Sequence, residues 1–485
     1  MASHIDPIER FLANVKVRPN QPAVAVKEKV VTYGELADRV FRIAAALADV
    51  APHPRVLIHL PQGADAYAAM LATLLAGGYY APTNVQAPME RQHLIRDRFR
   101  PDVVVTNATE APSLGLGDTP TIDVDDLPDA RLTAPRTPHD LAYVMFTSGS
   151  TGIPKGVMVG RTSLAHYVAW IGDAMAPGPQ DRWSQHPNVA FDLSVLDIYG
   201  ALCFGATLYP LISQRDRLMP GDFVRRNALT IWDSVPSVID QMRNARQVNP
   251  ECFKSLRLLT FCGEPLLPEH LDAIFAAAPS ATVHNTYGPT EATVSCTLIR
   301  LAPDTYRRAC GTSVALGEPI PGMSITLEGG STPDEGEIYI HGPQVARGYW
   351  LDDNETAAKF RPADASIKTT YRTGDMAVRV DGQLFFQARV DRQVKLHGHR
   401  IELGDIDAAL RSLGFTLAHT VKVGERLVAT VESDTTVDQD AILVQLKKML
   451  PDYCCPSQIV AIPSLPRNVN DKVDSERVKE MVRNV

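Results

Sequence analysis

Residues 140–156, "DLAYVMFTSGSTGIPKG", contain an apolar run followed by a loop of small and polar residues. Residues 140–147 have the length and apolar character of a buried strand. Residues 145–156 combine three glycines, four hydroxyl side chains and Lys155. Glycines let backbone N–H groups converge on an anion, and hydroxyls and an ammonium group add further donors. The stretch therefore predicts a strand with an anion-binding loop at its carboxyl end.

This loop does not have the register of a P-loop. That motif places a lysine directly before a serine or threonine that holds the metal ion. Here Pro154 precedes Lys155 and Gly156 follows it. Taken alone, the stretch leaves a second interpretation open, namely a glycine- and serine-rich surface turn.

The chain on both sides of this stretch predicts an α/β protein. A helix is expected from about Thr162, and residues 256–263 and 282–288 read as further strands that end in polar loops. Such strands alternate with helical patterns up to about residue 300, which is typical of α/β folds. Ligands bind at the carboxyl ends of strands in open α/β sheets, so the site is expected among these loops.

The pattern of apolar and polar residues changes after about residue 311. Short alternating segments separated by Gly, Pro and Asp turns extend to about residue 390 and predict a β-rich subdomain. We therefore expect two domains: a large α/β domain with several sheets over residues 1–390, and a small α+β domain over residues 391–485.

Composition excludes several classes of protein. A chain of 485 residues is too long to fold around a single ordinary hydrophobic core. The net charge of −8, from 48 basic and 56 acidic residues, disfavours nucleic-acid and anionic-membrane binders. The amino terminus lacks the apolar region of a signal peptide, and the apolar run 67–82 is too short and glycine-broken to span a bilayer. Seven scattered cysteines without metal-binding spacing predict reduced thiols and a cytoplasmic location.

Two further segments carry polar residues in tight turns. Residues 285–294, "NTYGPTEATV", place a tyrosine, a Gly-Pro turn, a threonine and a glutamate in one loop. Residues 371–377, "YRTGDMA", end a strand with an aspartate that is well placed to accept hydrogen bonds from ribose hydroxyls. Each motif is weak by itself, since a tyrosine before Gly-Pro is also common in packed turns.

Together and in this order, the motifs resemble the adenylate-forming (ANL-type) superfamily. The resemblance is strongest to amino-acid adenylation domains of nonribosomal peptide synthesis and to D-alanine–carrier-protein ligases. It extends over nearly the whole chain, through "VVTYGEL" (30–36), "LLAGGYYAP" (74–82), the glycine-rich loop, "FDLSVLD" (191–197), "FCGE" (261–264), "NTYGPTEA" (285–292), "GEPIPG" (317–322), "YRTGD" (371–375), "ARVDRQVKLHGHRIE" (388–402) and "NVNDKVD" (468–474).

The resemblance implies an ATP- and Mg²⁺-dependent ligase that works in two steps. An amino-acid carboxylate attacks the α-phosphate of ATP, and a pantetheine thiol then displaces AMP to form a thioester. Only about a dozen residues follow Lys472, and none resembles a pantetheine attachment site. The acceptor is therefore expected to be a separate phosphopantetheinylated carrier protein, and a small accessory protein is a further possible partner.

The resemblance also implies the residues that bind ATP. Tyr287 would stack on adenine, Asp375 would bind the ribose with Arg389 nearby, Thr290 would contact the α-phosphate, and Glu291 would carry Mg²⁺. The remaining implied nucleotide-binding residues are Thr147, Ser148, Gly149, Ser150, Thr151, Gly152, Lys155, Asn285, Thr286 and Gly288.

The small domain is implied to carry the catalytic lysine. Lys472 would bridge the substrate carboxylate and the phosphate, and rotation about Asp391 would remove it for the second step. Without the surrounding pattern, an exposed tail lysine would be the simpler interpretation. Two positions depart from the family pattern, because Ala388 and Asp471 stand where glycines are usual.

The implied amino-acid pocket begins with Asp192, which would pair with the substrate α-ammonium. Its alternative role is that of a helix N-cap. The other implied lining residues are Leu193, Leu196, Asp233, Thr260, Cys262, Thr286, Val294 and Ser295. The resemblance of "FCGE" and "FDLSVLDIY" to D-alanine ligases implies D-alanine or another small residue as the substrate. A buried Asp233 would need a partner, which implies instead a short polar or diamino acid. Alternatively, Asp233 turns toward a backbone or tyrosine partner.

Two other functions share some of these features. An acyl- or aryl-CoA ligase would have the same ATP motifs but no need for Asp192. A non-catalytic nucleotide-binding protein would lack Lys472 or Glu291, and both residues are present.

Overall fold

The structure is a computed structural model that describes residues 4–27, 29–147, 153–361, 369–433, 435–467 and 473–483. Backbone contacts divide the chain into two units. The first contains residues 1–84, 99–146 and 156–390, and the second contains residues 85–98, 147–155 and 391–485. The role of residues 391–485 as a mobile domain stays a prediction.

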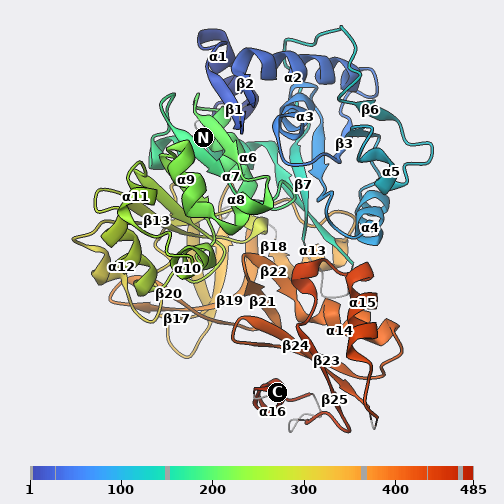
Figure 1. The fold of residues 1–485 in the computed structure, drawn as a ribbon, viewed down its shortest axis with the longest axis vertical. Coiled ribbons are helices and arrows are strands. Elements are labelled where there is room, and N and C mark those ends of the chain that lie inside the picture. Colours follow the sequence, from blue (N-terminus) through green and yellow to red (C-terminus); the bar gives the residue numbers. More distant parts are fainter. Residues whose placement is uncertain are drawn as a thin grey trace. The chain divides into compact units, whose positions relative to one another are not determined.

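Within the described residues, the largest sheet has the order β15-β14-β13-β12-β11-β9-β10-β1-β2. Its strands β1, β2 and β13 are labelled in Figure 1. Its strands are β1 (Pro22–Val26), β2 (Lys29–Thr32), β9 (Arg182–Gln185), β10 (Thr207–Pro210), β11 (Ile231–Ser234), β12 (Leu258–Phe261), β13 (Thr282–Tyr287), β14 (Thr297–Leu301) and β15 (Glu318–Pro319). The strands from β1 to β13 through β10, β9, β11 and β12 run parallel, while β2, β14 and β15 pair antiparallel at the edges.

A second sheet has the order β6-β5-β3-β4-β7-β8. Its strands are β3 (Arg55–Ile58), β4 (Tyr79–Pro82), β5 (Val103–Thr106), β6 (Thr121–Asp123), β7 (Leu141–Thr147) and β8 (Lys155–Gly160). β7 is the predicted strand of the opening stretch, and its first six residues are buried.

Helices of the first unit follow the predicted alternation with strands. They are α1 (Pro7–Val17), α2 (Tyr33–Ala48), α3 (Ala64–Leu75), α5 (Ala111–Leu114), α6 (Arg161–Met175), α7 (Leu193–Leu202), α8 (Gln214–Leu218), α9 (Pro220–Asn227), α10 (Ser237–Asn244), α11 (Pro250–Phe253), α12 (Pro268–Ala277) and α13 (Asp353–Lys359). Local sequence fixes some of their starts. At α2 the Thr32 hydroxyl accepts from the Glu35 backbone N–H at 3.2 Å, and the Glu35 carboxylate accepts from the Thr32 N–H at 2.8 Å, which is a capping box.

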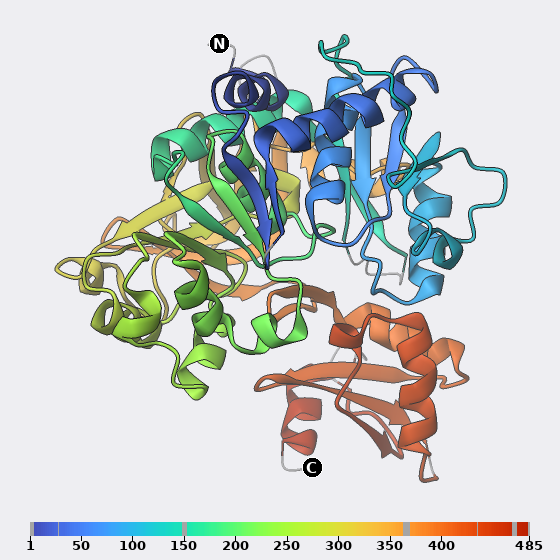
Figure 2. The same cartoon turned by 45° about the horizontal axis from the view of Figure 1, so that its top comes forward.

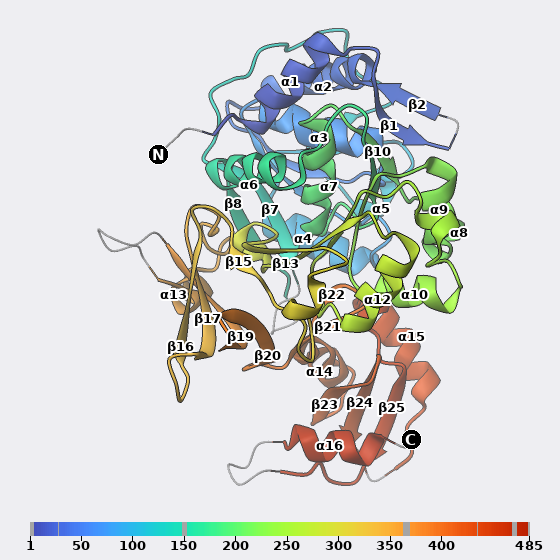
Figure 3. The same cartoon turned by 90° about the vertical axis from the view of Figure 1, so that its left-hand side faces the viewer.

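The two faces of the largest sheet belong to different apolar cores. Ile231 and Leu258 point into a core that includes α3, α6 and α7. Their chain neighbours Trp232 and Leu259 point into a second core with α9, α10, α11 and α12. Successive side chains of a strand alternate between faces, so this assignment fixes the orientation of every residue in β11, β12 and β13. Helices α6 and α7 lie side by side (Figure 3).

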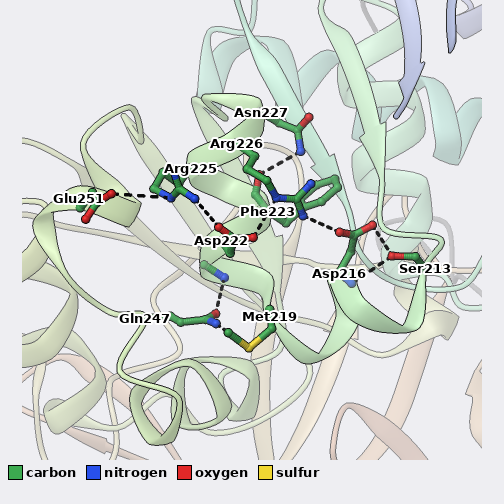
Figure 4. A network of polar contacts seen from close by, with 11 residues as sticks. Ser213, Asp216, Met219, Asp222, Phe223, Arg225, Arg226, Asn227, Gln247 and Glu251 are labelled. Atoms are coloured by element: carbon green, nitrogen blue, oxygen red, sulfur yellow. Dashed lines mark hydrogen bonds and ion pairs between the residues drawn. The ribbon is translucent and has the colours of Figure 1, made fainter. Parts of the chain in front are cut away.

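The helices on the second face are joined at the surface by a polar network (Figure 4). Arg226 pairs with Asp216 at 2.6 Å and with Asp222 at 2.9 Å, and Arg225 pairs with Asp222 at 2.6 Å. The Gly221 N–H donates to the Gln247 side chain at 2.8 Å. Exposed pairs of this kind contribute little free energy each, so we interpret the network as a clamp between α8 and α9 and not as a binding site.

The β-rich subdomain predicted between residues 311 and 390 forms a third sheet. It has the order β16-β17-β19-β18, with β20 paired to β19. Its strands are β16 (Ser324–Gly329), β17 (Glu335–His341), β18 (Phe360–Arg361), β19 (Thr370–Val380) and β20 (Gln383–Arg389).

The second unit contains α4 (Met89–Phe99) and the carboxyl-terminal elements, drawn in orange to red in Figure 2. These are β21 (Gln393–Leu396), β22 (His399–Glu402), α14 (Leu403–Ser412), β23 (Ala418–Val423), β24 (Arg426–Glu432), α15 (Gln439–Met449), β25 (Gln458–Ile462) and α16 (Ser475–Val482). Ala429 on β24 packs with α14 and α15, and its neighbour Val428 packs with α16, so helices cover both faces of the β23-β24-β25 sheet.

The architecture confirms the predicted fold class, a mixed α/β protein with several sheets and a β-rich part. No helix of the described chain has the length and apolar character needed to cross a membrane. The bounds of β12 and β13 and the start of α6 differ from the prediction by one or two residues, because the terminal residues of a predicted strand belong to its flanking loops. The strand predicted to end at "YRTGDMA" instead continues to Val380, so Asp375 lies within β19 and not in a terminal turn.

Candidate active site

One face of the largest sheet carries four of the predicted pocket residues. Asp233 and Thr260 are direct neighbours on β11 and β12, and Thr260 pairs in turn with His284 on β13. Cys262 and Thr286 follow at the alternating positions of their strands and therefore point to the same face. This is the face covered by α6 and α7. The register thus gathers residues that are about 50 positions apart in sequence.

The hydroxyl of Tyr167 marks the point where the predicted pocket residues converge. Tyr167 lies on α6 and its hydroxyl is 3.2 Å from Ser295 Oγ. Burial raises the pKa of this phenol well above its usual value, and Cys262, Asp233 and Asp192 raise it further. Leu193 and Leu196 are buried on the adjacent α7.

The alternative role of Asp192 as a helix cap is not realised. Asp192 is the residue before α7, but its side chain accepts no capping hydrogen bond from the first turn. Its charge instead acts on two buried tyrosines, since it raises the pKa of Tyr143 and of Tyr167 beyond the effect of burial.

Asp233 does not have the backbone or tyrosine partner considered for it. The side chain is fully buried, and neither carboxylate oxygen accepts a hydrogen bond from a donor of the described chain. It interacts with the carboxyl of Asp197 on α7. Burial raises the pKa of both carboxyl groups well above the usual range, which favours their protonated forms.

The predicted ribose-binding residues form a preorganised cluster. Asp375 and Arg389 are direct partners across β19 and β20, and an Arg389 guanidinium N–H donates to Asp375 Oδ1. The Tyr287 hydroxyl donates to Asp375 Oδ2 at 2.6 Å. A second N–H of Arg389 holds the Thr373 carbonyl at 3.1 Å. All three predicted side chains therefore meet at one buried carboxylate.

Thr290 and Glu291 lie on a single 3-10 turn, residues Thr290–Ala292. Glu291 is buried, and its Oε1 accepts a hydrogen bond from the Tyr349 hydroxyl at 2.7 Å. Mg²⁺ commonly binds through one or two carboxylates together with the phosphates of a nucleotide. A single oriented carboxylate fits that chemistry. Within the described residues, no cluster of three or more His, Cys, Asp or Glu side chains could hold a metal ion by itself.

The loop after this turn has an unusual backbone. Thr293 and Val294 have φ values of 58° and 71°, which side chains branched at Cβ rarely adopt. Gly288 lies against the same segment, where an added Cβ would come within 2.5 Å of Ser295 Cα. This close approach explains the glycine in "YGPT", and strained backbone of this kind is concentrated at functional sites.

Two predicted nucleotide-binding side chains donate hydrogen bonds to backbone carbonyls of the protein itself. The Asn285 amide donates to the Ala315 carbonyl at 2.9 Å, and the Thr286 hydroxyl donates to the Phe261 carbonyl at 3.1 Å. Both hold β13 in place. Thr147 similarly donates to the Lys155 carbonyl at 3.4 Å across the base of the glycine-rich loop.

Several predictions fall outside the described residues. They concern Ser148, Gly149, Ser150, Thr151, Gly152 and Lys472. The predicted hinge Asp391 is described, and its Oδ1 accepts from the Gln393 N–H at 3.3 Å.

Sequence reasoning missed the side chains that support the predicted ones. Tyr349 orients Glu291, Tyr167 joins the pocket residues, and Asp197 pairs with Asp233. Asp197 stands inside the quoted "FDLSVLD" motif, where a second carboxylate on one helix was a readable signal. The two tyrosines carried no local signal.

Comparison with known proteins places these residues in a family. Residues 11–350 match the family of AMP-binding enzymes. The L-proline–[L-prolyl-carrier protein] ligase of Streptomyces coelicolor is 34% identical over 92% of this chain and 91% of its own length. The D-alanine–D-alanyl carrier protein ligase of Staphylococcus haemolyticus is 31% identical over 95% of this chain and 96% of its own. The structure of the Vibrio cholerae adenylation domain AlmE in complex with glycyl-adenosine-5'-phosphate aligns with a TM-score of 0.86 and 28% identity, over 99% and 98% of the two chains.

Proposed function

The chain belongs to the AMP-binding enzyme family, and from this membership and its site we propose that it is an amino acid–carrier protein ligase. It activates an α-amino acid with ATP to the aminoacyl adenylate and transfers the aminoacyl group to the thiol of a separate carrier protein. Both curated relatives described above are amino acid–carrier protein ligases, and each match spans more than nine-tenths of both chains. An acyl- or aryl-CoA ligase is less well supported.

The main support for this proposal is the position of the Asp192 carboxylate and its electrostatic effect on nearby side chains. Asp192 precedes a buried helix without capping it and acts electrostatically on the buried Tyr143 and Tyr167. Asp192 is half-buried, and a carboxylate at this position would pair with the α-ammonium of an amino acid. A fatty or aryl acid has no cation to offer it.

In the first step, the substrate carboxylate attacks the α-phosphorus of ATP, the bond to the β-phosphate breaks, and pyrophosphate leaves. Asp375, held by Tyr287 and Arg389, would accept hydrogen bonds from the ribose. Glu291 would hold the Mg²⁺ that accompanies ATP, and Thr290 would contact the α-phosphate. Lys472 would stabilise the negative charge that builds up between the two reacting anions.

In the second step, the pantetheine thiol attacks the acyl carbon, a thioester forms, and AMP leaves with the electron pair of the broken anhydride. Rotation about Asp391 is the proposed means of withdrawing Lys472 between the steps. A cytoplasmic location is part of the proposal, since none of the seven cysteines lies in a disulfide.

The test is ATP–pyrophosphate exchange by the purified chain with single D- and L-amino acids, compared with fatty and aryl acids. Transfer is then followed with a labelled amino acid and three acceptors: a phosphopantetheinylated carrier protein, the same carrier without the prosthetic group, and free coenzyme A. We expect exchange with amino acids and label on the phosphopantetheinylated carrier. Exchange with fatty or aryl acids alone, with thioester on coenzyme A, would refute the proposal. If activity appears only when a small protein encoded beside this chain is co-expressed with it, that protein is an accessory protein.

A further inference from the structure

Three buried carboxylate oxygens near the proposed pocket lack hydrogen-bond donors. Asp197 and Asp233 have no exposed surface. Asp197 Oδ1 accepts from the Trp183 indole N–H at 2.9 Å, but Asp197 Oδ2 and both oxygens of Asp233 accept from no donor of the described chain. The two carboxyl groups lie close enough to share a proton. Even then, more acceptor sites remain than one proton can satisfy.

The hydroxyl of Thr260 also lacks a hydrogen-bond partner within the described chain. The residue is fully buried. It stands directly beside Asp233 in the parallel register of β11 and β12, so both side chains project from the same face of the sheet. Trp183 and Leu196 belong to the apolar core on this face. The polar groups near the cluster include the phenols of Tyr67 and Tyr167, the backbone N–H of His186 and the imidazole of His284 beside Thr260. Most buried polar groups of proteins are hydrogen-bonded, so this cluster requires an explanation.

Building on the proposed function, we propose that Asp233, backed by Asp197 and flanked by Thr260, is a second cation subsite that binds the side-chain ammonium of a short diamino acid. Two carboxyl groups that share one proton carry a single negative charge. One ammonium group neutralises that charge and supplies three N–H donors to the unpaired oxygens. A neutral side chain leaves both the charge and the oxygens uncompensated.

The positions of the acidic residues favour a short side chain. Asp192 directly precedes α7 and Asp197 lies on its second turn, and α7 covers the sheet face that carries Asp233. In the proposed site Asp192 takes the α-ammonium and the Asp197–Asp233 pair takes the second one. Both acidic positions belong to one helix and the strand beneath it, which favours a side chain of one to three methylene groups. The candidates run from 2,3-diaminopropionate through 2,4-diaminobutyrate to ornithine.

The experiment measures ATP–pyrophosphate exchange by the wild-type chain with these three diamino acids and with alanine and serine, each as D- and L-isomers. We expect kcat/KM for the preferred diamino acid to exceed that for alanine at least tenfold. In Asp233→Asn, which keeps the shape of the side chain but removes its charge, this ratio falls at least tenfold. Asp181→Asn is the matched control, because it removes a buried carboxylate paired with Arg257, and there the ratio does not change.

The outcomes separate the two proposals. No exchange with any amino acid would overturn the proposed function. Exchange with alanine or serine at least as good as with every diamino acid would overturn the present inference and leave the proposed function intact. An unchanged ratio in Asp233→Asn would also overturn it. If Asp233→Asn does not fold, the inference is tested by the wild-type ratio and by the variant Thr260→Val. This variant removes one unpaired hydroxyl and is expected to lower exchange with the diamino acid more than with alanine.

Discussion

Replacement of Asp375 by asparagine tests the nucleotide end of the site and its stability together. The Asp375 and Arg389 side chains are 4% and 10% exposed. Removing one partner of a buried pair costs about 3–5 kcal/mol, because the other charge stays buried without compensation. Asparagine retains one oxygen that can accept from Arg389, so we expect the low end, about 3 kcal/mol of the free energy of unfolding.

The same substitution is expected to weaken ATP binding. Hydrogen bonds to charged groups contribute about 1.5–3 kcal/mol each, and asparagine cannot present two charged acceptor oxygens to a ribose. The KM for ATP in pyrophosphate exchange should therefore rise by about 10- to 150-fold. Urea denaturation measures the loss of stability, and exchange is measured under conditions where circular dichroism shows the variant to be folded.

A control separates the two effects. Asp181 is 7% exposed and pairs with Arg257 at 2.7 Å, and it also accepts from the Thr230 hydroxyl at 2.7 Å. Because the Arg257 side chain is 41% exposed, Asp181→Asn should lose less stability than Asp375→Asn, with an unchanged KM for ATP. If Asp375→Asn were destabilised but kept the wild-type KM for ATP, Asp375 would have a purely structural role and the assignment of the ribose site would be wrong.

Three further predictions concern other parts of the chain. Burial lowers the pKa of His284 from 6.5 to about 3, so its stabilising effect is complete above about pH 6.5 and is lost as the pH falls toward 3. At pH 5 this amounts to about 2 kcal/mol, and His284→Leu should lose that much less stability than wild type between pH 7.5 and pH 5 in urea titrations. Tyr349→Phe removes the donor to Glu291 and should raise the Mg²⁺ concentration for half-maximal exchange about tenfold, whereas an unchanged Mg²⁺ dependence would exclude a positioning role for the tyrosine. Lys472→Ala should abolish adenylate formation but retain transfer from a supplied aminoacyl adenylate to the carrier, and loss of both half-reactions alike would contradict its assigned role.

The family and the chemical character of the site can be read from the order of the amino acids. Motifs such as "NTYGPTEA" and "YRTGD" consist of residues adjacent in the chain, so their order and identity are readable without coordinates. The α/β fold class followed from strand and helix periodicity for the same reason. Element ends were less certain, as at β12, where the structure has Leu258–Phe261, because the pattern of apolar residues continues into the flanking loops.

Which of these residues act together depends on the folding of the chain. Asp233 and Asp197 are 36 positions apart, and Tyr349 and Glu291 are 58 apart, so no local pattern links them. Their proximity depends on the order and register of strands and on the helix that covers one sheet face. A shift of one residue in β11 would turn Asp233 to the opposite core. The lack of hydrogen-bond donors to a buried carboxylate is likewise a property of the packed chain, since water hydrates every carboxylate of the unfolded chain. The pairing of Asp197 with Asp233 therefore had to be read from the structure.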